Sequence, residues 1–137
     1  MADSVTSQTI VDTEKRVVMK FTNLSDGNGE AAVKKVDVSA LTAHPDGTAC
    51  SQVTIDQIWY DVGGMRVLID FDASTNVAAL VLGGSAAAGN VHGHMDFRSF
   101  GGIKNNASSP TGDLDFTTSG HTNLDHYTIV LEMRKQY

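Results

Sequence analysis

The sequence is poor in cysteine, proline and basic residues, and each shortage excludes a class of protein. A single cysteine, Cys50, among 137 residues excludes an intrachain disulfide and any zinc site built on several cysteines. With 10 lysines and arginines against 16 aspartates and glutamates, the formal charge of -6 disfavours both sequence-independent nucleic-acid binding and contact with an anionic membrane. The sequence contains only 2 prolines but 13 glycines, so we expect many tight turns and few rigid linkers.

Long hydrophobic runs are also missing. The most apolar run, residues 77–82, is far too short to span a membrane. The first residues lack the basic region and apolar stretch of a signal peptide, which predicts a protein made and kept in the cytoplasm. A length of 137 residues fits one domain of ordinary size.

Apolar and polar side chains alternate along several short segments, which is the period of a half-buried strand. The alternation is clearest in residues 16–24 and 126–135. Between Ile55 and Ile58 its phase shifts, which predicts a bulge or bend within 52–62. Further strands are expected at residues 33–38, 65–72, 77–82, 91–97 and 113–117.

About eight short strands, separated by Gly, Asn and Ser turns and without an amphipathic helix, predict an all-β fold, an antiparallel β-sandwich with the jelly roll as its favoured form. Residues 1–14 are expected to form an N-terminal arm or edge strand, and residues 15–137 the sandwich domain. Gly63-Gly64 predicts a hairpin that joins 52–62 to 65–72.

Two further expectations concern the apolar run and the glycine-rich segments. The continuous apolar run at 77–82 predicts a central strand that is covered on both faces. Residues 83–89 and 101–112 are expected to be surface loops of small residues.

The segment 91–97 offers one candidate for metal binding. Period two projects His92, His94 and Asp96 from one strand face, opposite Val91, and imidazole with carboxylate suits a transition metal. The same face is equally that of an ordinary solvated strand, so no metal is assigned. His121 and His126 could add nitrogen ligands, or lie at a subunit interface.

Two pairs of aspartates offer a second candidate. Asp70 with Asp72, and Asp113 with Asp115, each place two carboxylates on one strand face, as a calcium site or a glycosidase would need. Neither pair lies in a calcium-binding loop, and solvated strand edges explain both.

Trp59 and Tyr60 offer a stacking platform for a sugar, although the expected arrangement puts one ring in the core and leaves the other half exposed. Neither a Gly-x-Ser-x-Gly elbow nor a phosphate-binding glycine loop occurs. The sequence therefore predicts no catalytic residue, no cofactor and no enzymatic activity.

Three stretches carry a resemblance to a known family. They are residues 20–27 leading to 36–39, residues 55–60, and residues 127–135. Together they resemble small virion proteins of tailed bacteriophages, above all of cyanophages. The resemblance implies a head decoration (cement) protein that is made in the host cytoplasm and sits on the capsid surface. Its implied partners are the major capsid protein and further copies of itself, as a dimer or trimer, and no active-site residue comes with it.

Three alternatives stay open. One is a tail or baseplate component of the same kind of particle. Another is a carbohydrate-binding β-sandwich that uses Trp59, Tyr60 and the aspartate pairs. The last is a metal-dependent enzyme on a double-stranded β-helix, in which His94 and Asp96 would join His121 or His126.

Overall fold

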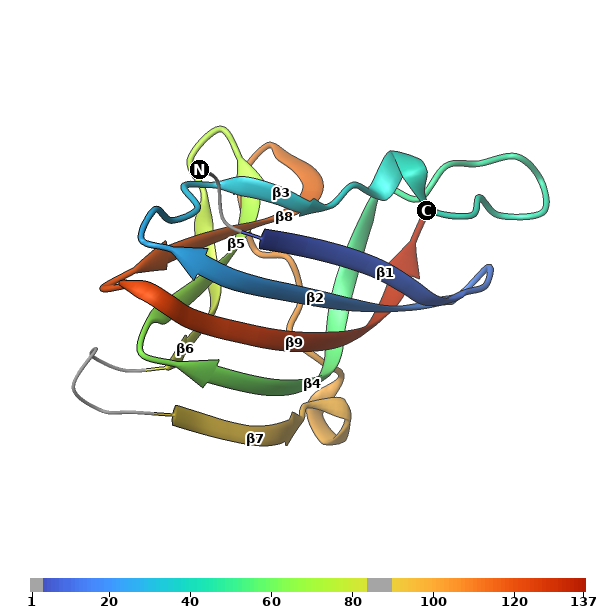
Figure 1. Ribbon diagram of the computed structural model, residues 1–137. Coiled ribbons are helices and arrows are strands. Elements are labelled where there is room, and N and C mark those ends of the chain that lie inside the picture. Colours follow the sequence, from blue (N-terminus) through green and yellow to red (C-terminus); the bar gives the residue numbers. More distant parts are fainter. Residues whose placement is uncertain (1–3, 84–89) are drawn as a thin grey trace.

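A computed structural model describes residues 4–83 and 90–137, which form two antiparallel sheets packed face to face (Figure 1). Sheet A has the strand order β1-β2-β9-β4-β7, and sheet B has the order β3-β8-β5-β6. The strands are β1 (Ser4–Asp12), β2 (Arg16–Asp26), β3 (Val33–Val36), β4 (Gln52–Gly63), β5 (Arg66–Ala73), β6 (Val77–Gly83), β7 (Asn90–Asp96), β8 (Pro110–Ser119) and β9 (Asn123–Gln136). The predicted antiparallel β-sandwich is confirmed.

The topology is that of a jelly roll. If β1 is set aside, each sheet has four strands, in the orders β2-β9-β4-β7 and β3-β8-β5-β6. The first and last of these eight strands, β2 and β9, are neighbours in one sheet, and the chain crosses repeatedly between the sheets, as in a double Greek key. β1 is a ninth strand, one more than the roughly eight predicted, and forms an edge of sheet A.

The core confirms the predicted alternation. Val17, Met19 and Phe21 of β2 are buried between the sheets. The pairing of β4 with β9 changes register between Ile55 and Gln57, at the predicted phase shift. Because of this bulge, both Ile55 and Ile58 point into the core, although they are three positions apart in the sequence.

The predicted hairpin at Gly63-Gly64 is wrong. β4 pairs with β7 and β9 in sheet A, whereas β5 pairs with β6 and β8 in sheet B, so the glycines carry the chain from one sheet to the other. Gly64 adopts φ +77° and Met65 is buried directly after it. Both strands thereby direct apolar faces into the same core from opposite sides.

The expected central strand at 77–82 is also wrong. β6 is an edge strand of sheet B and, among the described strands, pairs only with β5. Most of the segment expected as a loop at 83–89 lies outside the described residues. Across residues 4–83 and 90–137, no helix is long and apolar enough to cross a membrane.

A buried lysine holds the β1–β2 turn in place. The Lys135 ammonium contacts the Asp12 carboxylate and donates hydrogen bonds to the carbonyls of Thr13 (2.6 Å) and Thr42 (2.9 Å). The Lys135 side chain has no exposed area, so these acceptors replace the water that its charge would otherwise need. The far end of β1 is therefore fastened to β9.

Candidate functional site

The outer face of sheet A carries a stacked pair of rings. Trp59 of β4 points outward and is 38% exposed, whereas Tyr60 packs against the core, as expected for this pair. His94, the cross-strand partner of Trp59 on β7, lies parallel to the indole with ring centroids 4.9 Å apart and an interplanar angle of 11°. One face of the indole is therefore covered by an imidazole.

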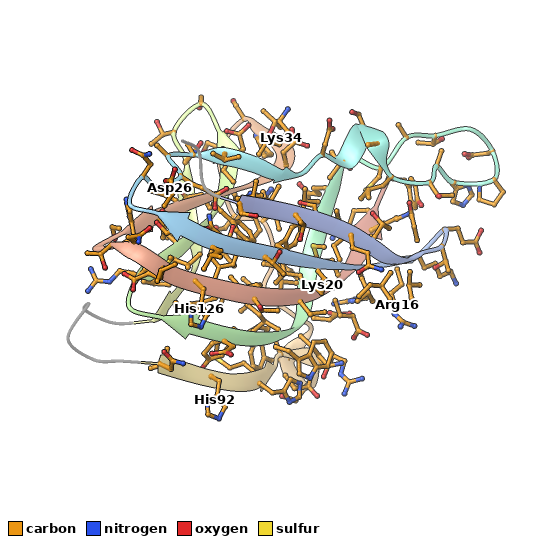
Figure 2. All side chains as sticks on the ribbon, in the orientation of Figure 1. Arg16, Lys20, Asp26, Lys34, His92 and His126 are labelled. Carbon is orange, nitrogen blue, oxygen red and sulfur yellow. The ribbon has the colours of Figure 1, made fainter. Side chains whose placement is uncertain are left out.

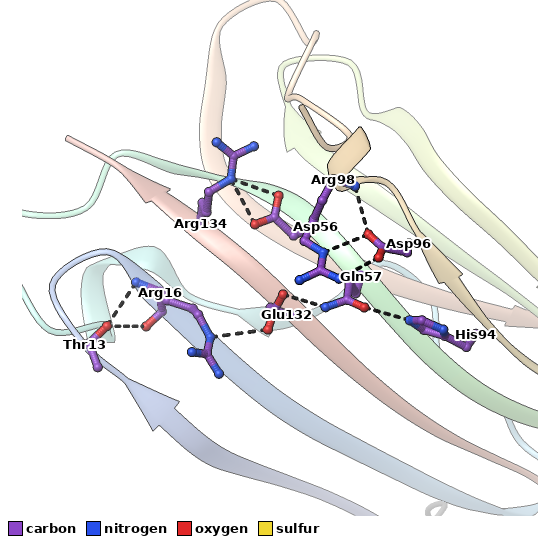
Figure 3. A network of polar contacts seen from close by, with 9 residues as sticks. All are labelled: Thr13, Arg16, Asp56, Gln57, His94, Asp96, Arg98, Glu132 and Arg134. Carbon is purple, nitrogen blue, oxygen red and sulfur yellow. Dashed lines mark hydrogen bonds and ion pairs between the residues drawn. The ribbon is translucent and has the colours of Figure 1, made fainter. Parts of the chain in front are cut away.

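A row of hydrogen bonds fixes the imidazole (Figure 3). The Gln57 amide nitrogen donates to Glu132 Oε1 (2.9 Å), which leaves Gln57 Oε1 to contact His94 Nε2 at 2.8 Å. Because a carbonyl oxygen only accepts, His94 Nε2 carries the proton. Arg16 continues the row by pairing with Glu132 at 3.3 Å, so the contacts run across β2, β9, β4 and β7.

Beside the stacked rings lies an open groove of about 410 Å³. Its lining comes from β4, β7 and β9 and consists of Trp59, Tyr60, Asp61, His92, Gly93, His94, Thr128 and Val130. A volume of this size falls within the usual range for small-molecule sites, about 300 to 1,000 Å³. The groove is our candidate functional site.

The three metal candidates share a face of β7, as predicted, but two have other partners. Asp96 binds the Arg98 guanidinium through two hydrogen bonds of 2.9 and 2.7 Å, and these bonds lower the pKa of that carboxyl to about 2. His94 is engaged by Trp59 and Gln57. Within the described ranges, no three His, Cys, Asp or Glu side chains gather in a way that could hold a metal ion.

The other two histidines do not join this group. The His121 ring packs against Gly29, where it fills the space of a side chain. His126 of β9 pairs with Gly63 of β4, and Gly63 pairs in turn with Asn90 of β7. Asn90 is four residues from His94 along β7. Figure 2 shows His92 and His126 on their separate strands. The enzyme hypothesis needs a His–Asp–His cluster, and these positions do not form one.

The aspartate pairs, by contrast, come together on the outer face of sheet B. Asp70 lies opposite Asp115 in the β5–β8 ladder. Burial, followed by the nearby Asp72 carboxylate, raises the pKa of Asp115 from 3.8 to about 6. Asp113 differs, because it pairs with Lys34 (3.1 Å) and accepts a backbone hydrogen bond. These aspartates lie within the part of the chain that the structure describes, and no group of three or more side chains there is arranged to hold a metal ion.

We expect this cluster to make stability depend on pH. Because the folded protein holds the Asp115 proton up to about pH 6 and the unfolded chain only to about 3.8, stability should fall as pH rises between these values. Asp115→Asn should therefore raise the free energy of unfolding at pH 7 by about 1 to 3 kcal/mol. Urea unfolding at pH 4.5 and pH 7 would measure it. Asp61→Asn, which removes an exposed charge, should leave the pH slope as it is; an unchanged slope in Asp115→Asn would contradict the prediction.

The sheet edges differ in charge. β1 has no charged residue from Ser4 to Val11, and β6 has none at all. In contrast, β3 carries Lys34 and Lys35, and β7 carries two histidines and Asp96. Charged side chains on an edge strand usually prevent its unpaired backbone from binding another chain. Two of the four edges lack this protection.

The two unprotected edges are exposed and lie on opposite sides of the sandwich. Val5 and Ile10 of β1 are 45% and 51% exposed, and Val81 of β6 is 59% exposed. Figure 1 shows β1 near β3 on one side, and β6 near β7 on the other. A bulge between Thr9 and Val11 interrupts only the last part of β1. Each edge therefore offers backbone donors and acceptors to a different neighbour.

Sequence reasoning found part of this site. It named Trp59, Tyr60, His92 and His94, but it treated the rings and the histidines as separate candidates. Asp61, Gln57, Glu132, Thr128 and Val130 were missed, since they come from a strand pairing that no local pattern reveals. The only feature of the sequence that pointed to this site was the phase shift that marks the bulge in β4. A shift of one residue reverses which side chains of a strand face outward.

Comparisons with known proteins identify no family. No protein-family model and no curated protein matches the chain. Among solved structures, a family 29 carbohydrate-binding module is similar at 8% sequence identity over 96% of this chain and 89% of that one, with a TM-score of 0.35. A mutant of such a module complexed with cellulohexaose is 9% identical over 96% and 91% of the two chains, with a TM-score of 0.34. At these scores the likeness says nothing about what this chain binds.

Proposed function

We propose that the chain is a structural protein of a bacteriophage virion, a head decoration (cement) protein that binds the outer capsid surface and joins neighbouring major capsid proteins. It is made in the host cytoplasm, has no catalytic role, and binds neither nucleic acid nor membrane. Besides the capsid, it binds further copies of itself.

The observation that supports this proposal best is the pair of edge strands β1 and β6, which carry no charged residue over residues 4–11 and 77–83. A cement protein has to hold at least two neighbours at once, and β1 and β6 offer two pairing edges on opposite sides. Pairing of an extended segment with such an edge gains backbone hydrogen bonds along its whole length. Repetition over a capsid lattice makes each contact effective even when a single one is weak.

The sequence resemblance and the net charge also support the cement role. The segments that resemble phage virion proteins include residues 20–27, which cover the second half of β2, and residues 127–135 of β9. These two strands are neighbours in sheet A. A formal charge of -6 suits a protein on the outside of a shell, since it does not face the packaged DNA.

The test is addition of the purified protein to expanded capsids assembled without it. We expect saturable binding and a higher temperature of capsid disruption. Val81→Lys on β6 and Gln8→Lys on β1 should each weaken binding by about tenfold or more, because an edge lysine must lose water when the strand is paired. Ala40→Lys, at an exposed position outside both edges, is the matched control and should bind normally.

Three results would count against the proposal or against the edges as its contacts. Protein that remains in solution at about micromolar concentration would rule out the cement role. Binding to isolated tails but not to heads would favour a tail or baseplate component. Equal binding by the edge variants and the wild type would mean that the contact lies elsewhere.

A further inference from the structure

The groove on sheet A combines an indole that is fixed in place with polar side chains that have no hydrogen-bond or ion-pair partner among the described residues. Trp59 cannot turn freely, because His94 stacks on it and is itself held through Gln57 by Glu132. A ring that is already oriented loses little conformational entropy when a ligand stacks on it. The fold therefore orders the indole before any ligand binds.

The polar groups lie in the neighbouring row of the sheet. Asp61 of β4 is in register with Thr128 of β9 on one side and His92 of β7 on the other. All three line the groove, and none of their side chains forms a hydrogen bond or ion pair with another described residue. Two residues along a strand span about 7 Å, so these groups lie just beyond the edge of the indole.

Gly93 lies between His92 and His94, but it belongs to the inner face of the sheet. Its cross-strand partner is Tyr60, and the Tyr60 hydroxyl is the nearest atom to the place where a Gly93 Cβ would be, at 3.1 Å. On the outer face, the groove lies between the row of Trp59 and His94 and the row of Asp61 and His92.

We propose that this groove binds a pyranose ring of a neutral glycan. A pyranose has an apolar C–H face that stacks on an indole, and hydroxyl groups around its rim that donate to a carboxylate and exchange hydrogen bonds with hydroxyl and imidazole groups. Trp59 supplies the platform, and Asp61, Thr128 and His92 supply the polar contacts. The Asp61 carboxylate and the net charge of -6 disfavour uronic acids and sulfated sugars.

The groove and the uncharged edges occupy different parts of the molecule. The groove lies on the outer face of sheet A, over β4, β7 and β9, whereas the proposed capsid contacts use β1 and β6. A glycan could thus bind while the protein is held in a lattice. The sugar site does not depend on the cement role, and either can fail without the other.

Intrinsic fluorescence tests the proposal directly, because Trp59 is the only tryptophan. Neutral oligosaccharides of glucose, mannose, galactose and xylose are added singly to the full chain, up to about 10 mM. At least one should shift the emission saturably. Isothermal titration of that sugar should show binding weakened by at least about tenfold in Trp59→Ala and about fivefold in Asp61→Asn. An oligosaccharide of uronic acids should bind more weakly.

Phe100→Ala is the matched control, since Phe100 is an exposed aromatic residue outside the groove; its affinity should equal that of the wild type. Trp59→Phe keeps a ring and should retain part of the affinity, which guards against a loss caused by misfolding. The proposal is overturned if no neutral oligosaccharide changes the emission, or if binding persists unchanged in Trp59→Ala.

Discussion

Replacing Gly112 by alanine is expected to lower the free energy of unfolding by about 3 kcal/mol or more. Gly112 is buried in β8 with φ +91°, and a Cβ there would lie 1.9 Å from the Ser51 carbonyl oxygen. Ser51 cannot move aside freely, because its N–H donates to the Gln136 carbonyl at 2.7 Å. The substitution would force β8 apart from the segment that leads into β4.

Gly47 provides a matched control for this variant. Its φ of +92° is almost the same, but a Cβ there meets nothing within 4 Å. Gly47→Ala therefore isolates the conformational strain, which we expect to cost about 1 kcal/mol. Urea unfolding followed by circular dichroism measures both variants. Similar losses in the two would show that the close approach of Ser51 is unimportant.

Glu30→Ala is expected to cost about 3 to 5 kcal/mol, the usual loss when one member of a buried ion pair is removed. The Glu30 and Lys35 side chains are in contact and are only 6% and 5% exposed. Glu30 also accepts hydrogen bonds from the Tyr127 hydroxyl (2.6 Å) and the Asn23 amide (3.0 Å). Without Glu30, the lysine charge is left buried beside donors that have lost this acceptor.

A double-mutant cycle separates the ion pair from the other contacts. Lys35→Met should cost less than Glu30→Ala, because the Glu30 carboxylate keeps two donors in its absence. The double variant Glu30→Ala with Lys35→Met should lose less than the sum of the single losses. Strict additivity in urea unfolding would contradict the proposed coupling between these side chains.

The alternation of apolar and polar residues was sufficient to predict the fold class and most of the strands. Period-two alternation in residues 16–24 placed Val17, Met19 and Phe21 correctly in the core. The phase shift after Ile55 located the bulge in β4. These features can be predicted because the direction of a side chain in a strand depends on its own position and on the two-sided burial of the sandwich.

The partners of each strand could not be read in the same way. Gly63-Gly64 has the composition of a hairpin turn, yet it joins two sheets, and the apolar run at 77–82 is an edge and not a centre. Both errors have one cause. A local sequence reports that a segment is extended and apolar, but its neighbours are chosen by the packing of the whole chain.

Local patterns in the sequence were enough to establish the all-β class, the inward and outward residues of most strands, the acidic charge, and the division of the Trp59-Tyr60 pair into one core ring and one half-exposed ring. Which of these residues meet depends on the tertiary structure. It placed Trp59 on His94, aligned Asp61 with Thr128 and His92, and left β1 and β6 open on opposite sides. Alternation depends on neighbours one or two residues away, whereas the groove and the edges depend on pairings between distant segments, which form only when the two sheets close over a common core.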